Sequence, residues 1–231
     1  MLIKFKTYLQ LMIYSGRLMA GKRFWIVIFL PLIWPVLKAL FVGIGWSEAK
    51  FNPADAHMLI SLPLSVVAMG LGLRIIAGEI DSRTLEIAYT VPGGCHRVWL
   101  AKIATCLCLL FASEVLLALF TMIFLVSVSI GTFYGALQAA MFYLVMGMGL
   151  SAFFRSEITG AMATIVFFAL GFMASSVRIS PFFNPLALSP SEKAQAVTYA
   201  IQNRIFFIIL IVVITLLTFL RVERREKMLR D

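Results

Sequence analysis

Long apolar stretches alternate with short polar segments along this chain. Each stretch comes close to about 20 residues or exceeds it, the length that lets an α-helix cross the hydrocarbon core of a bilayer. The pattern predicts six membrane-spanning helices, at residues 24–45, 57–78, 103–127, 132–154, 158–177 and 205–221. The predicted fold is therefore all-α, a polytopic membrane protein with a single transmembrane domain over residues 1–231.

Residues 1–23 form a segment of another kind. Lys4, Thr7, Gln10 and Arg17 recur at helical spacing, and bulky apolar residues occupy the remaining sides. A basic amphipathic helix of this type lies in the membrane interface and does not cross the bilayer. We expect an interfacial helix here.

The segment before the last span, residues 178–204, combines prolines with bulky apolar residues. Pro181, Pro185 and Pro190 interrupt any long helix, and the apolar residues disfavour a freely solvated loop. We expect short helices that dip partly into the outer leaflet, where protein or water covers their backbone ends.

The composition agrees with a membrane protein and leaves little room for a soluble catalytic domain. Hydrophobic residues make up 61% of the chain and charged residues 13%, whereas soluble domains carry roughly 25% charged residues. The mean hydropathy is +0.98. Because the predicted spans occupy most of the sequence, we expect a protein that is not an enzyme and has no nucleotide-hydrolysing domain of its own.

The net charge of +9 would suit a nucleic-acid-binding protein, but the placement of the basic residues indicates membrane topology. With a cytoplasmic N-terminus, 15 of the 20 Lys and Arg residues lie in cytoplasmic segments, four lie outside and Lys38 lies within a span. Positively charged segments stay in the cytoplasm and attract anionic lipid. We predict cytoplasmic N- and C-termini and no nucleic-acid partner.

Residues 79–102 form a charged island between the second and third predicted spans. Carboxylates crowd its beginning, where they suit the positive end of a helix, and Pro92 followed by two glycines ends the helical pattern. A short amphipathic helix of this kind can lie in a groove of a partner and pass movement to the spans on either side. An interfacial loop without a partner explains the same residues about equally well.

The run GEIDSRTLEIAYTVP, followed by RVWLAK, resembles the signature of ABC-2 type transporter permeases. In that family an acidic entry leads to a Thr-Leu-Glu core, then a proline, and a lysine at the next span. The matching positions here are Glu79, Asp81, Thr84, Leu85, Glu86, Pro92 and Lys102. Arg83 stands where the family usually has glycine, a departure that is compatible with a helix. The order of the predicted segments along the whole chain resembles the family as well.

The resemblance implies the membrane-spanning permease subunit of an ABC-type exporter in the plasma membrane, with no cofactor of its own. It implies a dimer with a second permease subunit and a partner ATP-binding cassette ATPase, which binds ATP and Mg²⁺. The residues expected to couple this chain to the ATPase are Glu79, Asp81, Arg83, Thr84, Leu85, Glu86 and Pro92. No residue pattern selects a substrate.

Two ionisable residues, Lys38 and Glu114, fall inside predicted spans. Both lie about 20 Å from the cytoplasmic edge at the rise of an α-helix, so an ion pair between them is geometrically possible. Charges inside a membrane are costly and indicate function by default. The alternative is that Lys38 extends outward to the interface and that Glu114 is protonated or pairs elsewhere. Cys106 and Cys108 have no histidine or third thiol nearby, so no metal site is predicted.

Three other functions stay open at this point. A haem-exporter-like permease of cytochrome c maturation has a similar size and a similar Leu-Glu, Pro and Leu-Ala-Lys pattern. A stand-alone secondary carrier or channel would use the buried Lys and Glu as an ion or proton site. A non-transporting scaffold explains the glycines in the spans but not the charged island.

Overall fold

Helices are the only regular elements in the part of the chain that the computed structural model describes, residues 13–19, 21–46, 52–81, 95–188, 191 and 193–223. A short helix covers residues 13–19. The labelled elements are α2 (Ile26–Phe29), η1 (Leu30–Leu32), α3 (Ile33–Gly43), α4 (Pro53–Asp81), α6 (Cys95–Phe124), α7 (Ile130–Phe154), α8 (Glu157–Met173), η2 (Pro185–Ala187), η3 (Lys193–Gln195) and α9 (Ala196–Val222).

Five helical stretches are long and apolar enough to cross a membrane, which identifies a multi-span membrane protein. They are Ile26–Gly43 (α2, η1 and α3 together), α4, α6, α7 and α9. The sixth predicted span, residues 158–177, corresponds to α8, which is apolar but has only 17 residues. Because a perpendicular crossing needs about 20 residues, the described structure supports five candidate spans and does not establish the sixth.

The helices extend beyond the predicted spans at both ends of the bundle. Helix α6 begins at Cys95, and α9 begins at Ala196. Hydropathy marks only the apolar part of each helix, whereas the hydrogen-bonded backbone continues into polar residues. Of the charged island, residues 79–81 belong to α4 and residues 95–102 to α6, and residues 82–94 lie outside the described residues.

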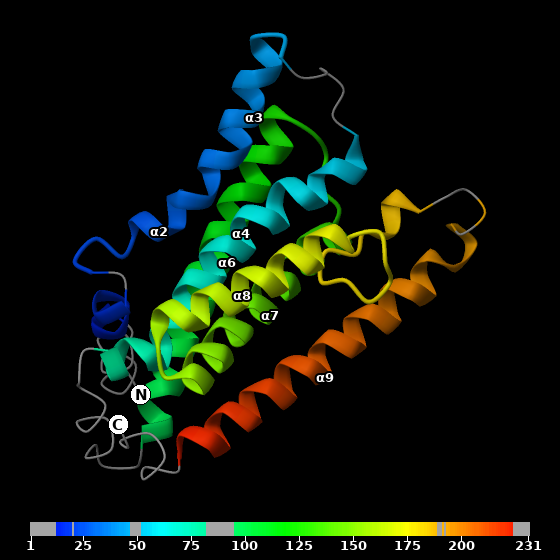
Figure 1. Cartoon of the computed structure of the whole chain (residues 1–231). Helices are drawn as coiled ribbons and strands as arrows, with labels where there is room; N and C mark the ends of the chain where they lie inside the picture. Colours follow the sequence, from blue (N-terminus) through cyan, green and yellow to red (C-terminus); the bar gives the residue numbers. More distant parts are fainter. Residues whose placement is uncertain are drawn as a thin grey trace, which may run out of the picture.

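Helix α4 packs along α7 at the centre of the bundle, with α6 on one side and α8 and α9 on the other (Figure 1). The approach of α4 to α7 depends on glycine. A Cβ atom on Gly72 would lie 2.1 Å from the carbonyl oxygen of Leu144, and one on Gly147 would lie 2.9 Å from that of Met69. Glycines let membrane helices pack with their backbones in contact, so these two positions fix the central helix pair.

The segment after α8 folds back into the bundle. Phe182 and Phe183 are buried, and the Phe182 ring stacks on Tyr143 of α7 at a centroid distance of 5.5 Å. The Asn184 side chain donates a hydrogen bond of 2.7 Å to the Ala54 carbonyl at the start of α4. Two short 3₁₀-helices, η2 and η3, follow. Short helices were predicted over residues 178–204, but α9 already begins at Ala196, so they are limited to the first part of that segment; their place in the outer leaflet stays a prediction.

Figure 1 also shows which helix ends lie together. The end of α4, the start of α6, the end of α9 and the helix at residues 13–19 meet at one end of the molecule (lower left). The segment between α8 and α9 lies at the opposite end. The stretch Ile26–Gly43 and helix α9 expose most of their apolar side chains, as lipid-facing helices do.

Candidate functional site

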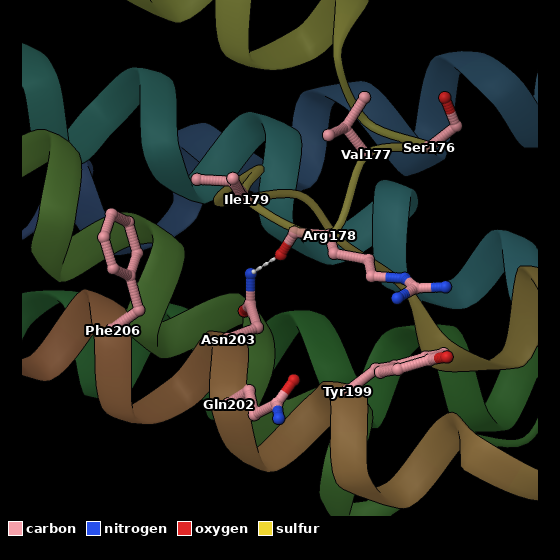
Figure 2. Close-up of a pocket in the computed structure, with 8 residues that line it drawn as sticks. All are labelled: Ser176, Val177, Arg178, Ile179, Tyr199, Gln202, Asn203 and Phe206. Atoms are coloured by element: carbon pink, nitrogen blue, oxygen red, sulfur yellow. Dashed lines mark hydrogen bonds between the residues drawn. The ribbon is translucent and has the colours of Figure 1, made fainter.

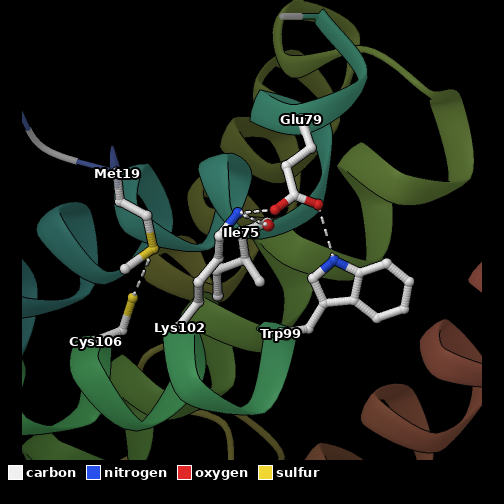
Figure 3. Close-up of polar contacts among 6 residues, drawn as sticks. All are labelled: Met19, Ile75, Glu79, Trp99, Lys102 and Cys106. Atoms are coloured by element: carbon white, nitrogen blue, oxygen red, sulfur yellow. Dashed lines mark hydrogen bonds and ion pairs between the residues drawn. The ribbon is translucent and has the colours of Figure 1, made fainter. Parts of the chain in front are cut away.

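A buried ion pair joins the end of α4 to the first turns of α6 (Figure 3). Lys102 Nζ lies 2.5 Å from Glu79 Oε1 and donates a second hydrogen bond of 2.9 Å to the Ile75 carbonyl. The side chains of Lys102 and Glu79 are only 4% and 13% exposed. Glu79 lies two residues before the end of α4 and Lys102 seven residues after the start of α6, so the pair ties together the two helices that flank residues 82–94.

Trp99 holds the other oxygen of the same carboxylate. Its indole Nε1 donates a hydrogen bond of 3.1 Å to Glu79 Oε2, and the side chain is 1% exposed. The indole ring also lies 6.1 Å from the ring of Phe219, in the last turns of α9. Trp99 and Lys102 are three residues apart and therefore lie on the same face of α6. Glu79 is held from two directions, and α9 is linked to the same point.

A second ion pair connects α4 to α8. Arg74 Nε lies 3.0 Å from Glu157 Oε1, and Arg74 Nη1 donates a hydrogen bond of 2.9 Å to the Met19 carbonyl. Asp81 Oδ2 accepts a hydrogen bond of 3.1 Å from the backbone N–H of Glu157, the first residue of α8. An anion at this position satisfies a free N–H group and suits the positive end of the helix dipole.

The helix at residues 13–19 is anchored at the same place. Met19 is 2% exposed, and its Sδ accepts a contact of 3.7 Å from Cys106 Sγ (Figure 3). Tyr14 and Leu18 are largely exposed on the other side. The exposure of Leu18 does not follow the amphipathic pattern, and residues 1–12 lie outside the described residues, so the interfacial helix stays a prediction.

These contacts form two groups that share helix α4, one around Glu79 and one around Arg74 and Asp81, and we call them together the anchor cluster. It consists of Arg74, Glu79, Asp81, Trp99, Lys102 and Glu157. Among the described residues no group of three or more His, Cys, Asp or Glu side chains is arranged to hold a metal ion. The charges and hydrogen bonds of the anchor cluster tie α4 to α6, to α8 and to the helix at residues 13–19, and the ring contact of Trp99 with Phe219 adds α9.

Glu79 and Asp81 were predicted to couple the chain to a partner. Both belong to the anchor cluster, whose contacts lie within this chain, so their coupling role stays a prediction. Arg83, Thr84, Leu85, Glu86 and Pro92 lie outside the described residues, so their role stays a prediction.

Arg74, Trp99 and Glu157 were not predicted as functional residues. One signal was missed: Arg74 was counted with the cytoplasmic residues although the predicted span 57–78 contains it, and a charge inside a span requires a partner.

The two intramembrane charges do not meet. Lys38, in α3, is half-buried, and the ion pairs of the described residues do not include one with Glu114. Glu114, in α6, is fully buried, and neither carboxyl oxygen has a hydrogen-bond partner within the described part of the chain. An unpaired buried carboxylate is very costly, so the structure fits the neutral, protonated form of Glu114.

No family model, curated protein or solved structure matches this chain. The established description is a helical, multi-span membrane protein with five candidate spans. Its function must therefore be argued from the anchor cluster and from the sequence.

Proposed function

We propose that this chain is the membrane-spanning permease subunit of an ABC-type exporter of the ABC-2 kind, with six spans, α8 being the short fifth one. A separate ATPase subunit in the cytoplasm binds and hydrolyses ATP, and a second permease subunit completes the transporter in the plasma membrane. The observation that carries the proposal is the buried contact of Lys102 with Glu79 and Trp99. This contact joins the two helices that flank the segment with the ABC-2-like sequence.

In this proposal, movement passes through the bundle along the contacts of the anchor cluster. A force applied to residues 82–94 reaches the end of α4 and the start of α6, which the anchor cluster locks together. Arg74 and Asp81 pass the same movement to α8 through Glu157. Trp99 passes it to α9. An ATPase docked on residues 82–94 can drive the bundle only if it binds two bundle conformations with different affinity, because equal binding shifts no equilibrium.

We expect replacement of residues 82–91 by a Gly-Ser linker of equal length to abolish copurification of the ATPase. The linker keeps α4 and α6 joined, so the bundle still folds, but it removes the side chains that a partner groove would bind. The measurement is affinity purification of the tagged chain after co-expression with a candidate ATPase. Deletion of residues 224–231, a basic segment on the same predicted side, serves as the control and should retain the ATPase. Copurification that survives the linker replacement would rule out docking through this segment.

The orientation is tested by thiol labelling at the same segment. Cys95, Cys106 and Cys108 are first replaced, and Ser82 is then changed to cysteine. In intact cells, we expect a membrane-permeant maleimide to label the Ser82→Cys variant and an impermeant one to leave it unlabelled. Labelling by the impermeant reagent would place the segment outside the cell and exclude a cytoplasmic ATPase as its partner.

A second candidate function, a stand-alone secondary carrier, is favoured by one observation. Glu114 is fully buried with both carboxyl oxygens unpartnered among the described residues, which is a suitable state for a group that takes up and releases a proton. A carrier would move its substrate in liposomes without ATP, whereas the proposed permease requires ATP and an ATPase.

The variant Glu114→Gln separates the two functions further. Glutamine has nearly the size of the protonated acid, so we expect the thermal stability to stay close to that of the unmodified chain. A carrier that cycles a proton on Glu114 would lose its flux by about a hundredfold, because the amide cannot exchange a proton. Reconstituted flux, measured with and without ATP and the ATPase, gives the answer. Full flux in this variant would exclude a transport role for the carboxyl group.

A further inference from the structure

Two pockets border α9, one near each end of the helix. The larger, about 590 Å³, lies between the first part of α9 and the segment after α8 (Figure 2). There Asn203 donates hydrogen bonds of 2.7 Å and 2.9 Å to the carbonyls of Arg178 and Ser180, and Arg178 stacks on Tyr199. These polar groups pack α9 against that segment.

The second pocket, about 230 Å³, lies between the last turns of α7 and the last turns of α9, and we call it the α7–α9 pocket. Each wall is a helical stripe with the spacing i, i+3, i+4 and i+7, which places its residues on one face of the helix. The pocket extends about 10 Å along the two helices, at 1.5 Å per residue. The lining residues are Met146, Gly149, Leu150 and Phe153 of α7, and Ile214, Leu217, Thr218 and Arg221 of α9.

Most of the α7–α9 pocket is apolar. At Gly149 the wall has no side chain, and a Cβ atom there would lie 3.0 Å from Thr218 Oγ1. The Thr218 hydroxyl donates a hydrogen bond of 2.7 Å to the Ile214 carbonyl, so it is already used within α9. Leu217 is 60% exposed, as a lipid-facing side chain is. The volume is below the roughly 300–1,000 Å³ of sites for drug-sized ligands and suits a single hydrocarbon chain.

Arg221 closes the α7–α9 pocket at the end of α9. Its guanidinium carbon lies 4.3 Å from the centroid of the Phe153 ring, and Nη2 donates a hydrogen bond of 3.3 Å to the Phe153 carbonyl. Nε is buried without a partner, and no carboxylate in the described part of the chain forms an ion pair with Arg221. A ring covers the face of a guanidinium group, whereas anions bind at its edge. The half-buried Arg221 therefore has N–H groups left at its Nη edge for an anion.

We propose that the α7–α9 pocket binds an anionic phospholipid. The phosphate would lie at the Nη edge of Arg221, and one acyl chain would lie along Leu150 and Leu217 toward Met146. The cation and the apolar walls follow each other in the order of a head group and its chain, because α9 is strongly apolar on the side of Arg221 that leads into the bundle.

The level of Arg221 in the membrane agrees with this occupant. Basic pockets between membrane helices on the cytoplasmic side bind anionic head groups, and the predicted orientation places the end of α9 on that side. The proposal depends on the multi-span membrane fold and is independent of the ABC-exporter function.

The experiment is native mass spectrometry of the full chain in detergent, titrated with phosphatidylglycerol or phosphatidylcholine of the same acyl chains. We expect one phosphatidylglycerol to bind more tightly than phosphatidylcholine. Arg221→Gln should lower that preference about tenfold, the effect of losing one charge-assisted contact. Arg97→Gln removes an exposed positive charge from the start of α6, at the same end of the bundle (Figure 1), and is the matched control that should keep the preference.

A second pair of variants leaves Arg221 and its contacts unchanged. Leu217→Trp places a larger side chain in the space of the acyl chain, and because Leu217 is exposed, the bundle should still fold. We expect this variant to lose the tightly bound phosphatidylglycerol. Leu216→Trp is the matched control and should keep it, because Leu216 is similarly exposed, at 56%, but does not line the pocket.

Several results would overturn the proposal. Equal affinity for the two lipids, or equal losses in Arg221→Gln and Arg97→Gln or in the two tryptophan variants, would show that the pocket does not select an anionic lipid. Competition by glycerol phosphate without acyl chains would show that a free anion is enough. A dimer that Leu217→Trp dissociates and Leu216→Trp leaves intact would assign the pocket to a second copy of the chain.

Discussion

Substitution of Gly72 by alanine is expected to destabilise the bundle more than any other single methyl group added to α4. The new Cβ would lie 2.1 Å from the carbonyl oxygen of Leu144 and 3.1 Å from its Cα. Both are backbone atoms of α7, so no side-chain rotation relieves the clash, and the two central helices must move apart. Overpacking of this kind costs about 3 kcal/mol or more where the backbone has to shift. The measurement is thermal unfolding of the purified protein in detergent, with size-exclusion chromatography to detect aggregation.

Gly70→Ala provides a matched control two residues away on the same helix. A Cβ on Gly70 would meet nothing within 4 Å. Alanine is favoured over glycine in a helix by roughly 1 kcal/mol, so this variant should be as stable as the unmodified protein or slightly more stable. Equal losses at Gly70 and Gly72 would contradict the close approach of α4 and α7.

Substitution of Lys102 by methionine is expected to lower the free energy of unfolding by about 3–5 kcal/mol, the cost of removing one partner of a buried ion pair. Methionine keeps most of the side-chain volume but leaves the Glu79 carboxylate without its cation at a site that is 13% exposed. It also leaves the Ile75 carbonyl without the ammonium donor. Equilibrium or thermal unfolding in detergent measures the loss.

Two comparisons distinguish a buried pair from a general effect of charge. Glu157→Gln breaks the ion pair of Glu157 with Arg74. Because these side chains are 31% and 52% exposed, respectively, the variant should lower the free energy of unfolding by about 1 kcal/mol or less. Combining Lys102→Met with Glu79→Leu should recover part of the loss, because no charge is then left buried without a partner. The interpretation would be wrong if Glu157→Gln cost as much as Lys102→Met, or if the double variant were no more stable than Lys102→Met.

Some positions show why the sequence predicted helices better than it predicted their ends. The apolar run 103–127 identified α6, but the helix begins at Cys95 because Trp99 and Lys102 have buried partners on α4 and α9. Hydropathy scores Lys102 as a membrane-external residue, whereas the structure buries it. For α8 the helix is shorter than the predicted span. The apolar pattern runs to residue 177, but the helix ends at Met173, and the segment that follows turns back into the bundle.

The predicted functional residues divide in the same way. Glu79 and Asp81 could be selected from their position at the end of a span. In the structure both contact other helices of the same chain, and their coupling role stays a prediction. The pairing of Lys38 with Glu114 rested on equal depth in the membrane. Equal depth does not fix the rotation of either helix about its axis, and these two side chains do not form an ion pair.

The sequence by itself determined that this chain is helical and crosses a membrane several times. Each helix satisfies its backbone hydrogen bonds within its own segment, and the apolar character of a segment depends only on the residues it contains. Tertiary structure alone decided that Gly72 meets Leu144, that Lys102 meets Glu79, and that Arg178 stacks on Tyr199. Such contacts depend on how the helices rotate and slide against one another. That arrangement is set by the packing of the whole bundle, which no local pattern contains.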